Sequence, residues 1–286
     1  MSLLADPLVQ RILIVSVLVG ITAPIVGTYL VQRRMALLGD GIGHVALAGV
    51  AAGWLAGSAA DLAKQDVLAV PGAILFAVGG AVVIERMRAR GTAAADVVMA
   101  ILFYGGIAAG VLLIGAAGGT NANLLGYLFG SISTVSWSDV WVTAALAAVI
   151  VVIGLGLRQA LFAVTHDQEF AHSTGLPVQA LNMVVAVLAA VTITVSMRVV
   201  GVLLVSALMI LPVAIAQLVT RSFTRTMTLA MAIGAVLTLT GVSITLNFNL
   251  QPGALIVVIA VGVYVAVAGT MSVLHKRTRT RSEVAA

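Results

Sequence analysis

Long apolar runs separated by short polar segments make up most of this chain. Each run is close to the roughly 20 residues that an α-helix needs to cross the hydrocarbon core of a membrane. The pattern therefore predicts an all-α polytopic membrane protein with about nine transmembrane helices, or eight if one run is re-entrant. The predicted spans cover residues 12–31, 37–57, 69–85, 96–115, 139–157, 178–196, 199–220, 227–246 and 253–272.

The basic residues are distributed unequally over the connections between these runs. When the connections are assigned to alternate sides, twelve of the 15 Lys and Arg residues fall on one side, and the other side keeps Arg11, Lys64 and Arg198. Basic residues concentrate in cytoplasmic loops. We therefore predict an amino terminus outside the cell, a carboxyl terminus in the cytoplasm and a basic cytoplasmic tail over residues 273–286. The net charge of +5 then reflects topology, and no nucleic-acid partner is expected.

The composition agrees with a membrane protein. With 61% hydrophobic and 9% charged residues, the chain cannot cover itself with polar surface as a soluble globule must. We expect a single transmembrane domain over residues 1–286 that crosses the membrane several times, with the first run kept as a helix rather than removed as a signal peptide. The chain has no Cys, so any metal ion would meet only oxygen and nitrogen ligands.

Asp40 and His44 are the most informative polar residues inside the apolar runs. They are four residues apart, so on a helix a carboxylate and an imidazole would share one face. A charged residue near the centre of a membrane helix costs about 2.5–3.5 kcal/mol on insertion scales, which favours a functional role. The pair predicts half of a metal site. The alternative is structural: His44 would hydrogen-bond within the bundle, and Asp40 would cap its helix near the cytoplasmic end.

The longest inner connection, residues 158–177, carries the other notable cluster of polar groups. It predicts a short amphipathic helix over residues 167–173, with an acidic first turn at Asp167 and Glu169 and an end at Gly175. Glu169 and Phe170 pair a charge with an apolar anchor that a partner groove could hold. The alternative is an ordinary solvated loop. His166 and His172 do not have the spacing of a known zinc motif.

Between the fourth and fifth spans, residues 118–139 are rich in Gly, Asn and Ser with aromatic residues interleaved. This segment predicts an outer loop with a short interfacial or re-entrant piece. Its aromatic side chains are expected to sit at the level of the lipid headgroups. They are Tyr127, Phe129, Trp137 and Trp141.

Several catalytic motifs do not occur in the sequence. It has no phosphate-binding loop of the Gly-x-x-x-x-Gly-Lys-Ser/Thr type, no His-Glu-x-x-His zinc-protease helix and no Gly-x-Ser-x-Gly nucleophile elbow. The chain is therefore expected not to be an enzyme. If it transports a solute with energy from ATP, the ATPase site must lie on another polypeptide. A secondary carrier driven by an ion gradient is the alternative.

Several segments of the chain resemble those of a known family of transporters. The run from Arg33 to Gly53 (RRMALLGDGIGHVALAGVAAG) resembles a segment of the permease subunits of zinc, manganese and iron ABC importers. The similarity continues through residues 167–177, 197–216 and 251–260, and so covers nearly the whole chain. It implies that residues 1–286 form a permease domain of the bacterial plasma membrane. It further implies a homodimer of permeases, a cytoplasmic dimer of ATP-binding subunits and an extracytoplasmic metal-binding protein. It also implies no tightly bound cofactor, with a divalent ion such as Zn²⁺ or Mn²⁺, or Fe²⁺, as the substrate.

The resemblance also assigns roles to residues. Asp40 and His44 match the family's metal path, and the segment from Asp167 to Gly175 matches the element coupled to the ATPase, which includes Glu169 and Phe170. Family members often carry Asp before the final Pro-Gly, where this chain has Asn249, so the outer mouth is expected to differ. One Asp and one His from each of two copies would provide four ligands, which suits Zn²⁺ and is also acceptable to Mn²⁺.

Overall fold

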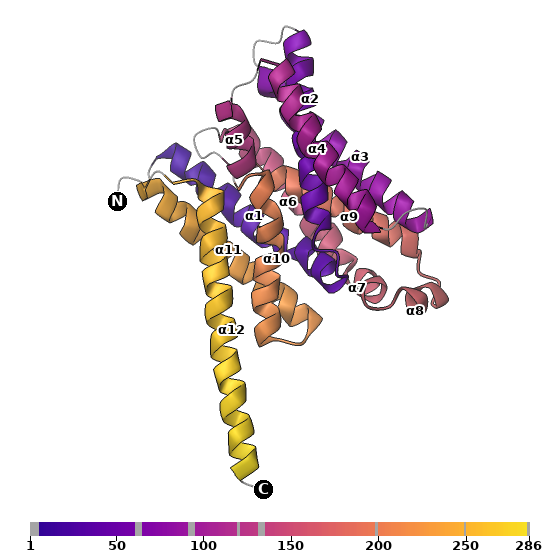
Figure 1. Cartoon of the computed structure of the whole chain (residues 1–286), viewed down its shortest axis with the longest axis vertical. Coiled ribbons are helices and arrows are strands. Elements are labelled where there is room, and N and C mark those ends of the chain that lie inside the picture. The colour runs from indigo at the N-terminus through magenta and orange to yellow at the C-terminus, as the bar shows by residue number, and fades with distance from the viewer. Residues whose placement is uncertain are drawn as a thin grey trace.

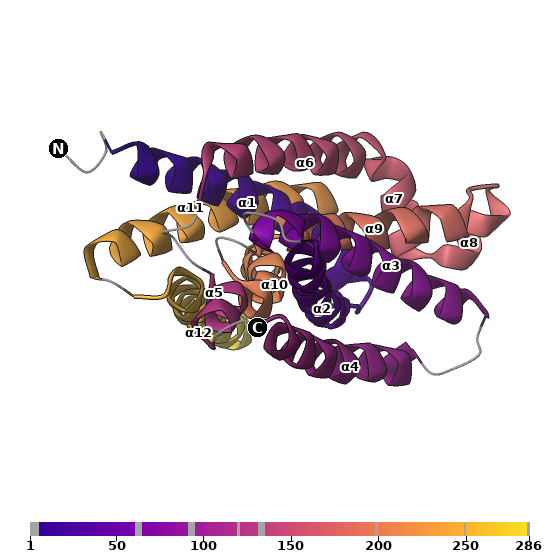
Figure 2. The same cartoon turned by 90° about the horizontal axis from the view of Figure 1, so that it is seen from above.

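The computed structural model describes residues 6–60, 65–90, 95–118, 121–130, 135–197, 200–248 and 250–284, and every regular element in these ranges is helical. Figures 1 and 2 show the arrangement from two perpendicular directions. The helices are α1 (Pro7–Gln32), α2 (Leu38–Ala59), the 3₁₀-helix η2 (Gln65–Leu68), α3 (Ala69–Arg90), α4 (Ala95–Ala116), α5 (Asn121–Phe129), α6 (Trp137–Gly156), α7 (Arg158–His166), α8 (Gln168–Ser173), α9 (Val178–Ser196), α10 (Val202–Val219), α11 (Phe223–Phe248) and α12 (Pro252–Val284).

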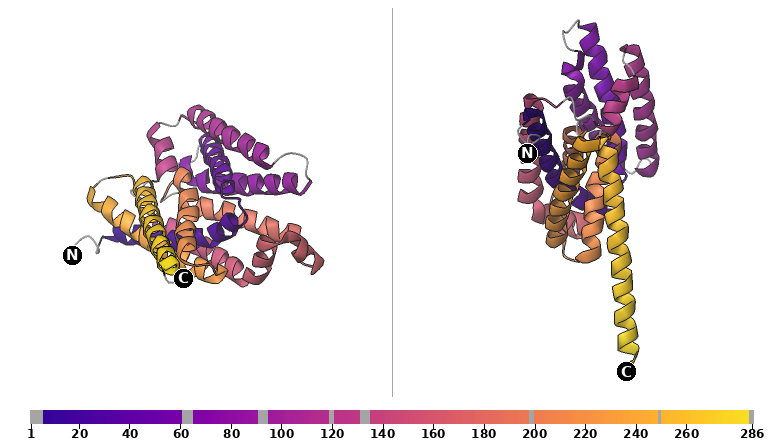
Figure 3. Two further views of the ribbon diagram at one scale, coloured as in Figure 1. Left: turned by 60° about the horizontal axis from the view of Figure 1, so that its bottom comes forward. Right: turned by 90° about the vertical axis from the view of Figure 1, so that its left-hand side faces the viewer.

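The helices coincide with the predicted spans. Within the described ranges, eight helices are long and apolar enough to cross a membrane, and α10 contributes a shorter apolar stretch at Leu204–Val219. These nine helices correspond one to one with the nine apolar runs, which confirms the predicted fold class. The basic segment after residue 272 continues α12 without a break, because neither Gly nor Pro interrupts it before Val284. Figure 3 shows α12 projecting beyond the rest of the bundle.

Three of the segments that carry basic residues lie toward the same end of the molecule. Figure 1 shows α7, α8, the turn between α10 and α11, and the carboxyl terminus toward the lower end of the molecule. The sequence assigned these same connections to one side. The relative sidedness of the loops is therefore consistent with the charge pattern, and their orientation toward the cytoplasm stays a prediction.

Local chemistry sets the helix ends. Asp6 accepts a hydrogen bond from the backbone N–H of Leu8 (2.8 Å), and Pro7 follows as the first helical residue of α1. At the other end of α1, Arg34 adopts a left-handed conformation (φ 56°), and the N–H of Met35 bonds to the carbonyl of Leu30 at 2.9 Å. This tight turn brings the chain directly from α1 into the first turn of α2.

Close backbone contacts hold α1 and α2 in the interior. α1 packs on α11, where a Cβ on Gly20 would lie 2.7 Å from the carbonyl oxygen of Gly234. The buried Tyr29 hydroxyl of α1 donates to the carbonyl of Gly154 on α6 at 2.5 Å. α2 contacts α3, α4, α9 and α10, and Figure 2 shows it among these helices. Asp40 and His44 therefore lie on α2, one of the helices that pack most extensively against the rest of the bundle.

Candidate functional site

Asp40 and His44 lie in the first two turns of α2, on one face as predicted. Asp40 is half-buried and His44 is 4% exposed. The His44 ring meets Phe103 of α4 edge-on, with ring centroids 4.3 Å apart. Its Nδ1 atom is buried and has no hydrogen-bond partner. A buried imidazole nitrogen without a partner is unfavourable in a finished core, and it is available to a ligand.

The structural alternative for this pair finds little support. The residue that precedes the first turn of α2 is Leu37, so Asp40 does not occupy the capping position. Its carboxylate accepts no hydrogen bond from the described residues, although it lies close enough to His44 to interact electrostatically. A carboxylate in the first turn still interacts favourably with the helix dipole. That interaction leaves both carboxylate oxygens free to bind an ion.

Glycines explain how other helices approach these two residues so closely. A Cβ on Gly106 of α4 would lie 2.6 Å from the carbonyl carbon of His44, so α4 and α2 touch backbone to backbone there. On another side of α2, a Cβ on Gly39 would lie 2.7 Å from Cε of Met209, and one on Gly43 would lie 3.3 Å from Cγ1 of Val202. The Gly-rich sequence around Asp40 thus serves close helix packing.

One copy of the chain provides only part of a metal site. Within the described ranges, no group of three or more His, Cys, Asp and Glu side chains is placed to hold a metal ion. Asp40 and His44 are two ligands, whereas a tetrahedral site needs four and an octahedral one needs six. The geometry therefore agrees with a metal site that two copies of the chain share, or that an ion occupies only briefly.

Beyond His44, the same helix enters an apolar cluster. Leu47 and Ala51 of α2 are buried there with Met197, and Trp54 packs against them at the edge. Trp54 also meets Tyr127 of α5 edge-on, with centroids 5.8 Å apart. Tyr127 thus packs against the bundle, and its level relative to the lipid headgroups stays a prediction. The buried members of this cluster that the structure describes are all apolar and offer no ligand to an ion.

The other aromatic residues of this segment behave differently. Trp141 is 73% exposed, as expected of a headgroup anchor. Trp137 lies under the guanidinium of Arg11, with 5.2 Å between Cζ and the ring centroid. Phe129 ends α5. Three residues that the sequence analysis named lie outside the described residues: Asn249 at the predicted outer mouth, Lys64 and Arg198.

The short helix predicted in the inner connection is present as α8. The Asp167 side chain accepts a hydrogen bond from the N–H of Phe170 (2.9 Å), and Gly175 ends the segment with φ +81°. Glu169 is exposed and Phe170 is 62% exposed. The sequence did not predict α7, the helix that precedes α8. In it Leu161 and Val164 are buried, and Phe162 stacks on His166 with centroids 5.6 Å apart.

A groove of about 990 Å³ runs between α8 and the ends of α3 and α9. Charged and polar residues from three elements line it. They include Glu85, Arg88, Glu169, His172 and Asn182.

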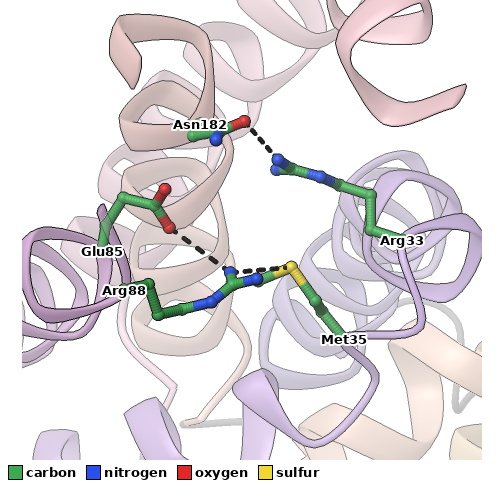
Figure 4. Close-up of polar contacts among 5 residues, drawn as sticks. All are labelled: Arg33, Met35, Glu85, Arg88 and Asn182. Atoms are coloured by element: carbon green, nitrogen blue, oxygen red, sulfur yellow. Dashed lines mark hydrogen bonds and ion pairs between the residues drawn. The ribbon is translucent and has the colours of Figure 1, made fainter. Parts of the chain in front are cut away.

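The polar contacts next to this groove join three helices (Figure 4). Arg33 donates a hydrogen bond to the side-chain oxygen of Asn182, and Arg88 lies 3.6 Å from Glu85 and 3.0 Å from the sulfur of Met35. Burial holds the pKa of the Arg33 guanidinium below its usual value, and the negative charge of Glu85 offsets part of this effect. The sequence analysis used these arginines only as markers of topology. Two features of the sequence could have indicated these contacts. One is the pair of arginines that precedes the Gly-Asp motif, and the other is Glu85, which lies next to the arginines at the end of α3.

Comparison with known proteins agrees with this arrangement. Residues 5–284 match the ABC 3 transport family. The chain is 31% identical to the manganese transport system membrane protein MntC of Halalkalibacterium halodurans, over 77% of this chain and 72% of that protein. It is 30% identical to the manganese import system permease protein ScaB of Streptococcus parasanguinis, over 76% of this chain and 74% of that protein.

A solved structure has the same fold. PsaBC from Streptococcus pneumoniae, determined in complex with a Fab, superposes with a TM-score of 0.81 at 28% identity, covering 93% of this chain and 92% of that one. The resemblance carried by the residues around Asp40 and His44 is thereby confirmed. The chain belongs to the ABC 3 transport family and is a multi-pass membrane permease of the metal-transporter type.

Proposed function

We propose that this chain is the membrane-spanning permease of an ATP-driven importer for a divalent transition metal ion, working as a homodimer. Manganese is the first candidate ion because two similar proteins are named as manganese transporters. Zn²⁺ and Fe²⁺ are the other candidates, since carboxylate and imidazole ligands serve all three. The ion is the substrate, and no resident cofactor is needed.

The observation that carries this proposal is the buried, unpartnered Nδ1 of His44 beside the Asp40 carboxylate. Two copies of the chain would bring two carboxylates and two imidazoles to the path. Those four ligands can hold an ion briefly while the charge of Asp40 offsets the cost of moving a cation through the membrane. The apolar cluster around Leu47, Ala51 and Trp54 would then close the path beyond the ion in this conformation.

The test is metal uptake by cells that lack their own importer and express the complete transporter. We expect Asp40→Asn and His44→Ala each to lower manganese uptake by at least about tenfold, because Asp40→Asn removes the negative charge and His44→Ala removes the imidazole ligand of each copy. His166→Ala is the matched control, since this histidine stacks on Phe162 in α7. Uptake at the wild-type level by both path variants, with normal amounts of protein in the membrane, would contradict the assignment.

The energy for transport would enter through α8. A permease without its own phosphate-binding loop must receive mechanical work from an ATP-binding subunit at a surface. α8 offers an exposed Phe170 next to an exposed Glu169 on a rigidly capped turn. α8 contacts α9, while the groove lined by Glu85 and Arg88 separates α8 from the end of α3. A push on α8 would therefore reach α2 through α9, which packs against α2.

A secondary carrier is the alternative function, and the placement of the carboxylates argues against it. A carrier driven by protons needs ionisable groups along the membrane path. Beyond Asp40 and His44, the buried carboxylate of Glu85 lies near the end of α3 and is 3.6 Å from Arg88. Uptake that stops on ATP depletion but survives collapse of the ion gradient would support the ABC importer. The opposite result would support the carrier.

An extracytoplasmic metal-binding protein is the third proposed partner. It would deliver the ion to the mouth where Asn249 replaces the Asp found in many family members. Asn keeps a carbonyl oxygen but removes the negative charge, so ion transfer there would rely less on electrostatic attraction. Asn249→Asp should therefore raise the apparent affinity for ion delivery if this position contacts the ion.

A further inference from the structure

The hydroxyl of Ser206 on α10 differs from most of the other buried hydroxyls described in the long helices. Ser206 is 3% exposed, and its Oγ has no hydrogen-bond partner. By contrast, Ser16, Thr28 and Thr192 each donate to the carbonyl four residues earlier, at 2.7 Å. That local bond is the usual way for a membrane helix to satisfy a hydroxyl. Ser206 leaves it unused, at a cost in free energy.

Ser206 faces Gly39, the residue before Asp40, in the first turn of α2. A Cβ on Gly39, the residue before Asp40, would lie 3.3 Å from Ser206 Oγ. One turn away, a Cβ on Gly43 would lie 3.3 Å from Cγ1 of Val202. These two contacts show that α2 and α10 run antiparallel here, with Ser206 level with the first turn of α2. Asp40 follows Gly39 by about 100° around the helix axis. The hydroxyl and the carboxylate therefore border the same turn.

We propose that Ser206 supplies an additional oxygen ligand to the metal ion beside Asp40 and thereby helps to select among divalent ions. This inference rests on the proposed function. A hydroxyl oxygen is a hard, neutral donor, which suits Mn²⁺ better than softer ions such as Cd²⁺. In a homodimer each copy would add one oxygen to the Asp and His pair. The set would then approach the six ligands that Mn²⁺ favours, rather than the four of a tetrahedral zinc site.

The experiment compares Ser206→Ala and Ser206→Cys in cells that lack their own importer and express the complete transporter. Uptake of Mn²⁺ and of Cd²⁺ is measured over a range of concentrations. Ser206→Ala should raise the apparent KM for Mn²⁺ by about fivefold to tenfold, since it removes one oxygen contact. Ser206→Cys replaces the oxygen with a soft sulfur of similar size. It should raise the preference for Cd²⁺ over Mn²⁺ by at least about tenfold.

Ser16→Ala and Ser16→Cys are the matched controls. Ser16 is equally buried, but its hydroxyl bonds to Ile12 and it lies in the half of α1 remote from the turn into α2. Both control variants should keep the wild-type ion preference. A packing role for Ser206 would change the amount of folded protein without changing that preference, so the Cd²⁺ to Mn²⁺ ratio separates the two roles.

Two results decide the proposal. An unchanged ion preference in Ser206→Cys, together with an unchanged KM for Mn²⁺ in Ser206→Ala, would overturn it. Asp40→Asn and His44→Ala are measured in the same cells. If they abolish uptake while the Ser206 variants behave as wild type, only the inference about Ser206 fails. If they too have no effect, the proposed metal path itself fails.

Discussion

The Arg33 side chain at the end of α1 donates a hydrogen bond to the side-chain oxygen of Asn182 on α9. The two residues are far apart in the sequence, and their contact links the turn before α2 to the helix that follows α8. Arg33 is half-buried and Asn182 is 9% exposed, so water cannot readily replace the bond. The contact therefore ties the candidate metal path to the candidate coupling element.

Asn182→Leu should destabilise the protein because it leaves a half-buried guanidinium without its partner. We expect a loss of about 1–3 kcal/mol in the free energy of unfolding, seen as a lower melting temperature in detergent. Asn182→Asp should keep the contact as an ion pair and melt near the wild type. Asn247→Leu is the control, since Asn247 is exposed and its side chain bonds within its own helix, to Ser243 at 2.9 Å. Equal melting temperatures for Asn182→Leu and the control would contradict the role of this bond.

The sequence was sufficient to predict the spans because a membrane imposes a length on every crossing helix. The ninth run illustrates both the strength and the limit of that rule. Its start near residue 253 was predicted within one residue of Pro252, but the helix continues to Val284, where polar residues replace apolar ones. Hydropathy marks where lipid ends, whereas helix propensity decides where the helix ends.

The sequence also placed Asp40 and His44 on one face, because that relationship is local. It could not place Phe103 and Gly106 beside His44, or Ser206 beside Gly39, since those contacts join α2 to α4 and α10 through helix packing. It likewise missed the bond between Arg33 and Asn182. A charge pattern reports on topology, but the identity of a partner depends on how the helices are arranged in space.

The coupling role of α8 predicts a loss of energy transfer without a loss of the metal path. The double substitution Glu169→Arg and Phe170→Ala removes the exposed charge and the apolar anchor, both of which a partner groove would hold. We expect loss of co-purification with the ATP-binding subunit or ATP hydrolysis without metal uptake. The measurement is co-purification together with uptake in vesicles.

Ser173→Ala is the control for this prediction. Ser173 is exposed on the same helix, and its hydroxyl only bonds back to the carbonyl of Phe170 at 2.8 Å. Its loss should leave coupling intact. If the double variant retains both co-purification and uptake, α8 is a simple connector and the docking surface must lie elsewhere, for example around Arg86 to Arg90.

The orientation of the chain is testable with reporters. A reporter fused after Arg281 should be cytoplasmic, and one inserted near Asp61 should face the outside, because the basic connections concentrate at one end of the bundle. Labelling with a reagent that cannot cross the membrane distinguishes the two sides. Access to both positions from the same side would show that one of the assumed spans does not cross the membrane.

Two neighbouring glycines on α4 test whether the close approach of α4 positions His44. A Cβ on Gly106 would lie 2.6 Å from the carbonyl carbon of His44 and 2.8 Å from the backbone nitrogen of Val45. A Cβ on Gly105 would meet nothing within 4 Å. Gly106→Ala should therefore push α4 away from α2, and Gly105→Ala should not.

The pair is well matched because each substitution brings the same intrinsic gain of about 0.5–1 kcal/mol for replacing Gly by Ala in a helix. Any difference in the free energy of unfolding thus isolates the contact with α2. We expect Gly106→Ala to be less stable than Gly105→Ala by about 1–3 kcal/mol, as is typical of overpacking. Backbone atoms cannot move aside as a flexible side chain would, so the displaced α4 should also carry Phe103 away from the His44 ring. Metal uptake should then fall in Gly106→Ala even at temperatures where the protein is fully folded. Equal stability and equal uptake in the two variants would show that α4 does not hold His44 in place.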